Sequence, residues 1–195
     1  MKCVIIFGPS AVGKATVGKE LANNLGYKLF HNHMVIELVH NFFTWSDAEF
    51  WKLVGDIRNR IFEEIKASRI TGVVFTYVWA LDQQSDHDEL MDYMKSLGVV
   101  LEDIYFVELS ANQEERLERN KDERRLAEKK TKRNIEESER FIFESETKYK
   151  LNSNGDFMYP DQHLKIDNTK LTVGETTKLI TEGLGEFYHK HLKNV

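Results

Sequence analysis

Short apolar runs alternate with longer amphipathic segments along this chain. The runs lie at residues 4–7, 27–30, 73–78, 104–109 and 163–166. Between them, apolar positions recur every three or four residues, which is the period of a helix with one buried face. Five short strands separated by helices predict an α/β fold with a parallel sheet that is covered on both faces. Ligands of such sheets lie beyond the carboxyl ends of the strands.

The helical segments carry recognisable ends. The helix expected directly after the first run should end at Gly26, a residue type that caps helices well. A long amphipathic helix is predicted from Ser46, because Ser46–Glu49 has the spacing of a capping box. Further helices are expected at 86–97 and from about 173 to 191. The apolar face of the long helix is predicted to consist of Phe50, Leu53, Ile57, Ile61 and Ile65.

The first run ends in a glycine-rich turn that leads straight into a helical segment. From residue 8 the chain reads Gly-Pro-Ser-Ala-Val-Gly-Lys-Ala-Thr, which is the spacing of a phosphate-binding P-loop. Such a turn points backbone N–H groups at an anion, and the helix N-terminus adds positive potential. The alternative is a plain turn between strand and helix. We expect ATP phosphates to be held by Gly8, Ser10, Ala11, Val12, Gly13, Lys14, Ala15 and Thr16.

The position after Lys14 departs from the common motif. A Ser or Thr hydroxyl contacts Mg²⁺ there in most P-loops, whereas this chain has Ala15 followed by Thr16. Gly-Lys-Ala-Thr resembles the Gly-Lys-Gly-Thr of adenylate kinase and other nucleoside monophosphate kinases. The resemblance implies that Thr16 contacts phosphate and that Mg²⁺ is held largely through water. Thr16 is therefore the residue assigned to the metal.

Composition describes one domain over residues 1–195 with a charged segment at about 114–150. The chain has 41% hydrophobic and 30% charged residues and a net charge of −5, which disfavours nucleic acids and membrane surfaces as partners. No apolar stretch approaches the length of a signal peptide or a membrane span. The single cysteine, Cys3, lies within the first run and is expected to be buried. We expect a cytoplasmic monomer or weak dimer.

The charged segment interrupts the alternation of strands and helices. On composition alone it is a solvated helical hairpin. Beside a P-loop it also fits a lid that closes on ATP, excludes water and brings arginines to the transferring phosphoryl group. Its basic residues include Arg116, Arg119, Arg124, Arg125, Lys129, Lys130, Lys132 and Arg133.

The P-loop, the charged segment and the Ile166-Asp167-Asn168-Thr169 run together resemble the small P-loop kinases. That group includes shikimate kinase, gluconate kinase and the nucleoside monophosphate kinases. The order of elements covers nearly the whole chain. The resemblance implies a three-layer P-loop fold with a five-stranded parallel sheet and a helical lid. It also implies ATP and Mg²⁺ as cofactors and a small molecule as phosphoryl acceptor.

Shikimate kinase supplies a parallel for the lid. Its lid carries an Arg followed a few residues later by Arg-Pro-Leu, to which Arg119 and the Arg124-Arg125-Leu126 run are similar. By that analogy Arg119 stacks near the adenine, and Arg124 and Arg125 face the phosphates. Asn168 would lie beside the base.

The same parallel identifies a candidate acceptor site. An Asp-x-Asp pair at the end of the second strand is matched here by His31 and His33, and a substrate-binding arginine on the next helix by Arg58. A glycine run after the third strand is replaced by a segment containing Tyr77 and Trp79. These replacements make shikimate itself a poor candidate substrate. The candidate acceptor contacts are His31, Arg58, Tyr77 and Trp79, with His33 beside them.

Three roles are open for the two histidines. On an extended segment His31 and His33 would point the same way, so they could bind a metal, although no nearby cysteine or second carboxylate completes a ligand set. They could also be structural groups under the following helix. At an acceptor site, a neutral His33 could take the proton from a hydroxyl while His31 contacts phosphate or substrate.

The sequence thus predicts transfer of the γ-phosphoryl group of ATP to a hydroxyl of a small molecule. The residues expected to act in catalysis are Lys14, Arg124, Arg125 and His33. One alternative is an ATPase or nucleotide sensor, because the third strand ends without a carboxylate. Another is a kinase that acts on a nucleotide or a polynucleotide end, although the acidic charge disfavours a polynucleotide. A non-catalytic domain would not require Lys14 in a glycine loop.

Overall fold

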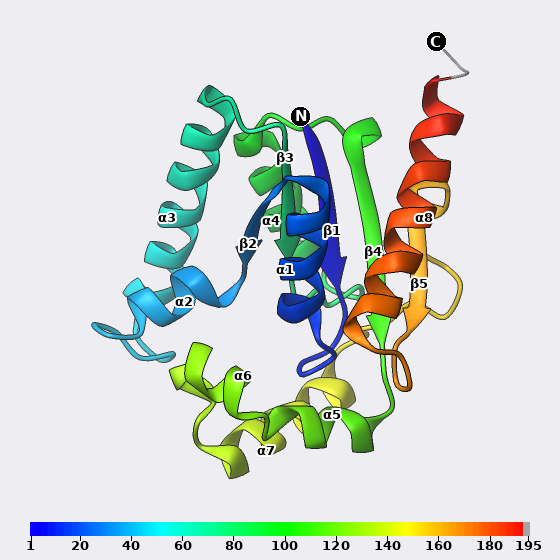
Figure 1. Cartoon of the computed structure of the whole chain (residues 1–195). Coiled ribbons are helices and arrows are strands. Elements are labelled where there is room, and N and C mark those ends of the chain that lie inside the picture. Colours follow the sequence, from blue (N-terminus) through cyan, green and yellow to red (C-terminus); the bar gives the residue numbers. More distant parts are fainter. Residues whose placement is uncertain (193–195) are drawn as a thin grey trace.

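One parallel sheet forms the centre of the protein, which the computed structural model describes over residues 1–192 (Figure 1). Its five strands follow the order β2-β3-β1-β4-β5, and every neighbouring pair is parallel. The predicted α/β class and parallel sheet are therefore confirmed. The strands are β1 (Lys2–Phe7), β2 (Lys28–His31), β3 (Gly72–Thr76), β4 (Ile104–Ser110) and β5 (His163–Asp167).

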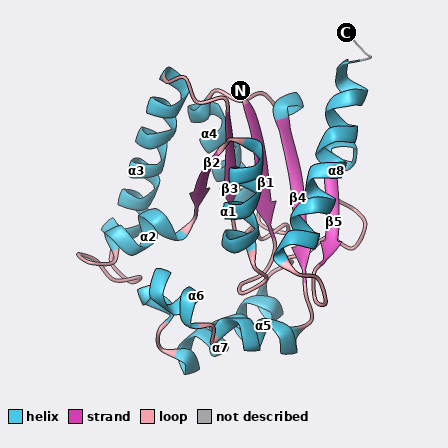
Figure 2. Cartoon of the chain, in the orientation of Figure 1, coloured by secondary structure: helices cyan, strands magenta, loops and turns pink. Residues whose placement is uncertain are grey.

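Helices cover both faces of this sheet and one of its ends (Figure 2). Three short 3₁₀ helices, η1 (Leu101–Asp103), η2 (Lys130–Lys132) and η3 (Pro160–Gln162), add to them. Every helix among the described residues is too short or too polar to span a bilayer. The α-helices are α1 (Lys14–Leu25), α2 (His33–Val39), α3 (Ala48–Ala67), α4 (Gln84–Leu97), α5 (Gln113–Asn120), α6 (Glu123–Glu128), α7 (Ile135–Lys148) and α8 (Val173–Leu192).

Two hydrophobic cores flank the sheet because successive side chains of a strand point to opposite faces. From β1, Cys3, Ile5 and Phe7 enter the core under α3 and α4, while Val4 and Ile6 enter the core under α1 and α8. The uninterrupted apolar run of β1 therefore reflects a central strand that is buried on both faces. Cys3 is buried as a free thiol, as expected.

The long helix α3 differs from its predicted form. Asp47 is its N-cap, but the Asp47 carboxylate accepts a bond from the Thr44 amide (2.6 Å), so no capping box forms. Of the predicted apolar face, Phe50, Leu53, Ile57 and Ile65 pack on the core, whereas Ile61 is exposed. The fully buried row follows a spacing of four residues. A buried arginine in that row explains the difference, because a pattern of apolar residues counts arginine as surface. The row consists of Phe50, Val54, Arg58 and Phe62.

Helices α5, α6 and α7 form a separate layer below the carboxyl ends of the strands (Figure 1). The chain enters this layer from β4 and returns from it to β5. The charged segment predicted at about 114–150 is therefore helical and lies at the end of the sheet where parallel sheets bind ligands. We call residues 113–148 the lid.

A buried carboxylate anchors the return from the lid to the sheet. Glu108 of β4 has no exposed surface and accepts hydrogen bonds from the Ser153 amide (2.8 Å), the Ser153 hydroxyl (2.5 Å) and the Asn152 side chain (3.0 Å). Lys165 and His163 pair with it at 2.9 and 3.0 Å. Burial alone would raise the pKa of Glu108, but the bonds from His163, Ser153 and Lys165 outweigh it and lower that pKa to about 2.

This depressed pKa predicts a specific loss of stability in acid. A carboxylate whose folded pKa lies below its unfolded value stabilises the protein above the unfolded pKa and stops doing so as the pH falls through the folded pKa. Between about pH 5 and pH 2, Glu108 should account for a loss of roughly 3 kcal/mol in the free energy of unfolding. Urea unfolding of the wild type and of Glu108→Gln over this range measures it, with Glu49→Gln as an exposed control. Equal pH slopes in wild type and Glu108→Gln would contradict the assignment.

Candidate functional site

Residues 8–16, which comprise the loop between β1 and α1 and the first residues of α1, have the backbone of an anion-binding turn. We call them the glycine loop. Gly8 and Gly13 have φ angles of 134° and 98°, which side chains disfavour, and Ala11 is also left-handed at 61°. A Cβ atom on Gly8 would collide with the Leu109 carbonyl oxygen. Glycine is therefore required at position 8 both by backbone angle and by the closeness of β4.

The carbonyl groups of this glycine loop are bound by donors that lie around it. Lys14 Nζ donates to the carbonyl oxygens of Gly8 and Pro9, both at 2.7 Å. Arg116 reaches the Ser10 carbonyl oxygen at 3.4 Å. The loop is thus held from its carbonyl side.

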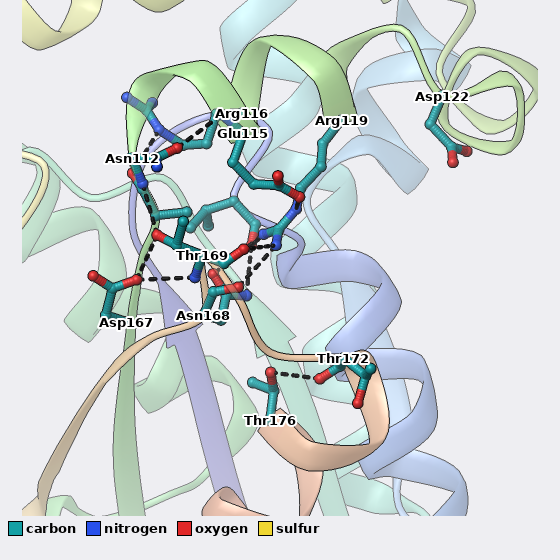
Figure 3. Close-up of polar contacts among 12 residues, drawn as sticks. Asn112, Glu115, Arg116, Arg119, Asp122, Asp167, Asn168, Thr169, Thr172 and Thr176 are labelled. Carbon is teal, nitrogen blue, oxygen red and sulfur yellow. Dashed lines mark hydrogen bonds and ion pairs between the residues drawn. The ribbon is translucent and has the colours of Figure 1, made fainter.

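Arg119 and Asn168 complete this support at Val12 (Figure 3). Arg119 Nη1 donates to the Val12 carbonyl oxygen at 3.2 Å, and Asn168 Nδ2 donates to the same atom at 2.9 Å. Arg119 also binds the Asn168 side chain and main chain (3.2 and 2.8 Å), with Glu115 holding its Nε at 2.8 Å. The two residues that the sequence predicted beside the base are therefore in contact with each other and with the loop.

The amide side of the loop is left unpaired. Within residues 1–192, the backbone N–H groups of residues 11–16 donate no hydrogen bond, and Gly13, the N-cap residue of α1, supplies no side-chain cap. The first N–H groups of a helix need an outside acceptor and favour an anion. Thr16 is exposed at the same end of α1. This arrangement can bind phosphate.

Basic residues of the lid surround this loop. Burial lowers the pKa of Lys14 well below its usual value, and the charges of Lys129, Arg125 and Arg116 lower it further. Lys129 itself has its pKa lowered to about 8, by burial and then by Arg125. The site therefore collects positive charge that an anion would neutralise.

The two neighbouring arginines of the lid are placed differently. Arg125 is half-buried and binds Asn120 through Nε (3.2 Å), within electrostatic reach of Lys14. The Arg124 side chain is 88% exposed and pairs with Asp122 at 3.0 Å. Only Arg125 of the two lies where it can approach the loop in this arrangement.

At the end of β2 the chain turns at once into α2. Asn32 has helical angles (φ −49°, ψ −38°) and His33 begins the helix, so the extended alternation predicted for His31 and His33 does not occur. The His31 Nδ1 atom is buried without a hydrogen-bond partner, and burial lowers the pKa of His31. His33 Nδ1 lies 3.1 Å from Glu37 Oε1.

Glu37 also contacts the lid. Its carboxylate accepts bonds from the Thr131 amide (3.1 Å) and the Thr131 hydroxyl (2.5 Å). Glu37 was not among the predicted site residues, because only its location on the helix after His33 favoured it. A spacing of four residues on a helix is nevertheless a signal for such a pair. The sequence placed Lys129 among the basic residues of the lid, but nothing in it indicated that Lys129 lies near Lys14 or that Thr131 contacts Glu37, because both placements depend on how the lid folds back.

The remaining predicted acceptor contacts are largely covered. Arg58 is 2% exposed and donates to the Asn32 carbonyl (3.4 Å), the Asn32 side chain and the Tyr93 hydroxyl (3.3 Å). Tyr77 is nearly buried and donates to Glu89. Trp79 has no exposed surface. It packs on the rings of Phe7, Phe106 and Phe157, which makes it part of the hydrophobic core.

The described residues include no group of three or more His, Cys, Asp and Glu side chains that could hold a metal. At the end of β3, the Thr76 hydroxyl accepts a bond from the Asn32 amide at 3.2 Å.

Solved structures of several small-molecule kinases share this fold, which confirms the fold predicted from the sequence. Solved structures with this fold include a gluconokinase from Sinorhizobium meliloti 1021, with a TM-score of 0.61 and 17% identity over 99% of this chain and 97% of that one. A deoxyadenosine kinase from M. mycoides, solved with dCMP and dCDP, has a TM-score of 0.56 and 20% identity, covering 94% and 99% of the two chains.

A shikimate kinase from Acinetobacter baumannii, solved with shikimate, superposes with a TM-score of 0.55 and 18% identity, covering 95% of this chain and 94% of that one. Searches against protein-family models and curated proteins found no match. At these identities the likeness establishes the fold, and the reaction has to be argued from the site.

Proposed function

We propose that this protein transfers the γ-phosphoryl group of ATP to a hydroxyl group of a small molecule. The observation that carries the proposal is the glycine loop with its carbonyls bound and its amides at residues 11–16 free. That loop is faced by lid cations that perturb the pKa of Lys14. A polyphosphate satisfies both features at once, because it accepts from the amides and neutralises the cations.

Each part of ATP has residues assigned to it. The amides of residues 11–16, Lys14 and the Thr16 hydroxyl hold the β- and γ-phosphates. Arg119 and Asn168 lie on the opposite side of the loop and are assigned to the base and its ribose. Arg125 approaches the γ-phosphate from the lid, where a positive charge stabilises the transferring group.

Mg²⁺ fits this site as a companion of the nucleotide. Ala15 offers no oxygen, so Thr16 and phosphate oxygens are the groups we assign to hold it, with water completing the shell. When bound, the ion offsets negative charge on the β- and γ-phosphates. The protein's own contribution is to place the phosphates and the lid cations.

We assign the acceptor to the neighbourhood of His33, where the end of β2 and α2 meet the lid. Burial lowers the pKa of His33 to about 4, so the ring is neutral near pH 7 and can accept a proton from an attacking hydroxyl. His31 faces the same region and is assigned to substrate or phosphate. Arg58 is buried next to Asn32, and we assign it to holding Asn32 and the end of β2 in place.

A nucleoside acceptor is the second candidate. Phe42 and Trp45, in the connection between α2 and α3, and Trp51, in the first turn of α3, are exposed aromatic residues. Lys132 of the lid lies 5.7 Å from the Trp45 ring. Aromatic rings beside a lid can stack on a base. If the protein is instead an ATPase without an acceptor, label from γ-labelled ATP should appear only in free phosphate.

We expect γ-labelled ATP with Mg²⁺ and a pool of small metabolites to yield a newly labelled compound. Lys14→Ala should abolish this label because the loop loses its point charge on the phosphates. Thin-layer chromatography of the products measures the result, with Lys19→Ala, an exposed lysine on α1, as the matched control. Label that appears only in free phosphate would contradict the kinase and favour the ATPase.

Substitutions of Arg124 and Arg125 should have different effects on kcat in the same assay. Arg125→Ala should lower kcat by about a thousandfold, because a charge on the transferring group is lost. Arg124→Ala should change kcat by less than about threefold, because it removes an exposed ion pair. Steady-state kinetics with the labelled acceptor measures both, and equal losses for the two variants would overturn the placement of Arg125.

A further inference from the structure

We propose that Glu37 is a positioning residue that holds neutral His33 with its proton on Nδ1 and fastens the lid through Thr131 with the same carboxylate. This inference rests on the proposed function for its meaning in catalysis. Its structural content concerns only Glu37, His33 and Thr131, and it can be tested without ATP or an acceptor.

The contacts of Glu37 join two parts of the chain that are far apart in sequence. On α2, the Glu37 side chain is 16% exposed and lies one helical turn after His33, whose side chain is 17% exposed. From the lid, Thr131 donates its hydroxyl to Oε1 (2.5 Å) and its amide to Oε2 (3.1 Å). Both carboxylate oxygens are therefore engaged, and Oε1 is shared between His33 and Thr131.

The ionisation state of Glu37 fixes which ring nitrogen of His33 carries the proton. Burial alone would raise the pKa of Glu37, but the bonds from His33 and Thr131 outweigh it and lower that pKa to about 2. An ionised carboxylate only accepts hydrogen bonds. Since His33 Nδ1 faces Oε1 at 3.1 Å, Nδ1 must donate and Nε2 is left with its lone pair.

The charges around His33 keep the ring in this neutral form. Burial lowers the pKa of His33 to about 4, the Glu37 bond opposes this, and Lys129 and Lys132 of the lid lower it again. A neutral ring whose Nε2 accepts is the form a general base requires. Within the described residues, Nδ1 is the His33 ring atom with a hydrogen bond, so Nε2 remains available.

The lid helps to orient the His33 ring, and the same Glu37 carboxylate fastens the lid. The Thr131 amide can only donate, so it requires an acceptor oxygen at the Oε2 position. With that position fixed, the other Glu37 oxygen is directed at His33. Fastening the lid and orienting the ring are therefore consequences of one carboxylate rotamer. The same contact sets η2 beside α2, and η2 follows Lys129, which faces Lys14.

The variant Glu37→Gln distinguishes this account from a purely structural role. The Thr131 amide should hold the glutamine oxygen at the former Oε2 position. The glutamine NH₂ group then faces His33 and donates to Nδ1. His33 should therefore change tautomer and carry its proton on Nε2, although the fold and the lid contact are kept.

Long-range ¹H–¹⁵N correlation spectra of protein with ¹⁵N-labelled histidine report this directly at pH 7, and the spectrum of His33→Asn assigns the His33 signals. We expect an Nδ1–H tautomer in the wild type, an Nε2–H tautomer in Glu37→Gln, and wild-type signals in the exposed control Glu49→Gln. A wild-type ring protonated on Nε2, or a tautomer unchanged in folded Glu37→Gln, would overturn the proposal.

Hydrogen exchange of the Thr131 amide tests the lid contact independently. Glu37→Ala should speed its exchange by more than about tenfold, because the amide loses its acceptor, whereas Glu37→Gln should protect it nearly as well as the wild type. Circular dichroism confirms that each variant is folded. Unchanged Thr131 exchange in Glu37→Ala would show that the carboxylate does not fasten the lid.

Kinetics separate this inference from the proposed function. With a labelled acceptor in hand, Glu37→Gln should lower kcat by about a hundredfold and leave the KM for ATP nearly unchanged, since a misoriented base affects the chemical step. If no acceptor is ever labelled but the tautomer and exchange results hold, the proposed function fails and the structural role of Glu37 stands. A normal kcat in Glu37→Gln with a switched tautomer would overturn the role of His33 as base.

Discussion

The site depends on one constraint, which is the orientation of the peptide groups in the glycine loop. Their carbonyl oxygens accept hydrogen bonds from surrounding side chains, and the N–H groups of residues 11–16 are left without a protein acceptor. Lys14 and Asn168 donate to carbonyl oxygens of the loop, and Arg119 adds a bond to the same Val12 oxygen as Asn168. Had those carbonyls turned inward, the site would repel phosphate. The left-handed angles at Gly8 and Gly13 allow this orientation, and close packing against Leu109 keeps it.

The lid adds positive charge beside this phosphate cradle. Lys129 and Arg125 bring charge to the side of Lys14, and the Glu37–Thr131 contact joins the lid to the end of β2. Like charges held close together cost free energy, so the arrangement is expected to gain stability when an anion enters. The resulting picture links the phosphate cradle, the lid and the candidate base His33 in one network.

The sequence predicted the sheet well because local signals and burial agree there. The apolar run of β1 leads into a glycine loop and a helix that ends at Gly26, and each of these features is present. The α3 face was predicted in part, because Phe50, Leu53, Ile57 and Ile65 pack on the core while Ile61 is exposed. Apolar periodicity did not reveal Arg58, which is buried with bonds to Asn32 and Tyr93.

The candidate acceptor site was harder to predict for a related reason. Trp79, expected near the acceptor, is enclosed by aromatic residues from β1, β4 and the 149–162 segment, and these meet only in three dimensions. Glu37 carried a local signal through its spacing from His33. Thr131 carried none, because a contact across 94 residues depends on the path of the lid.

Isothermal titration calorimetry with ATP, ADP and AMP, each with Mg²⁺, tests the central claim most directly. If the free amides of residues 11–16 and the cations around Lys14 form a polyphosphate site, ATP and ADP should bind and AMP should bind at least about a hundredfold more weakly. Equal affinity for AMP and ATP, or no binding of any of the three, would contradict the account.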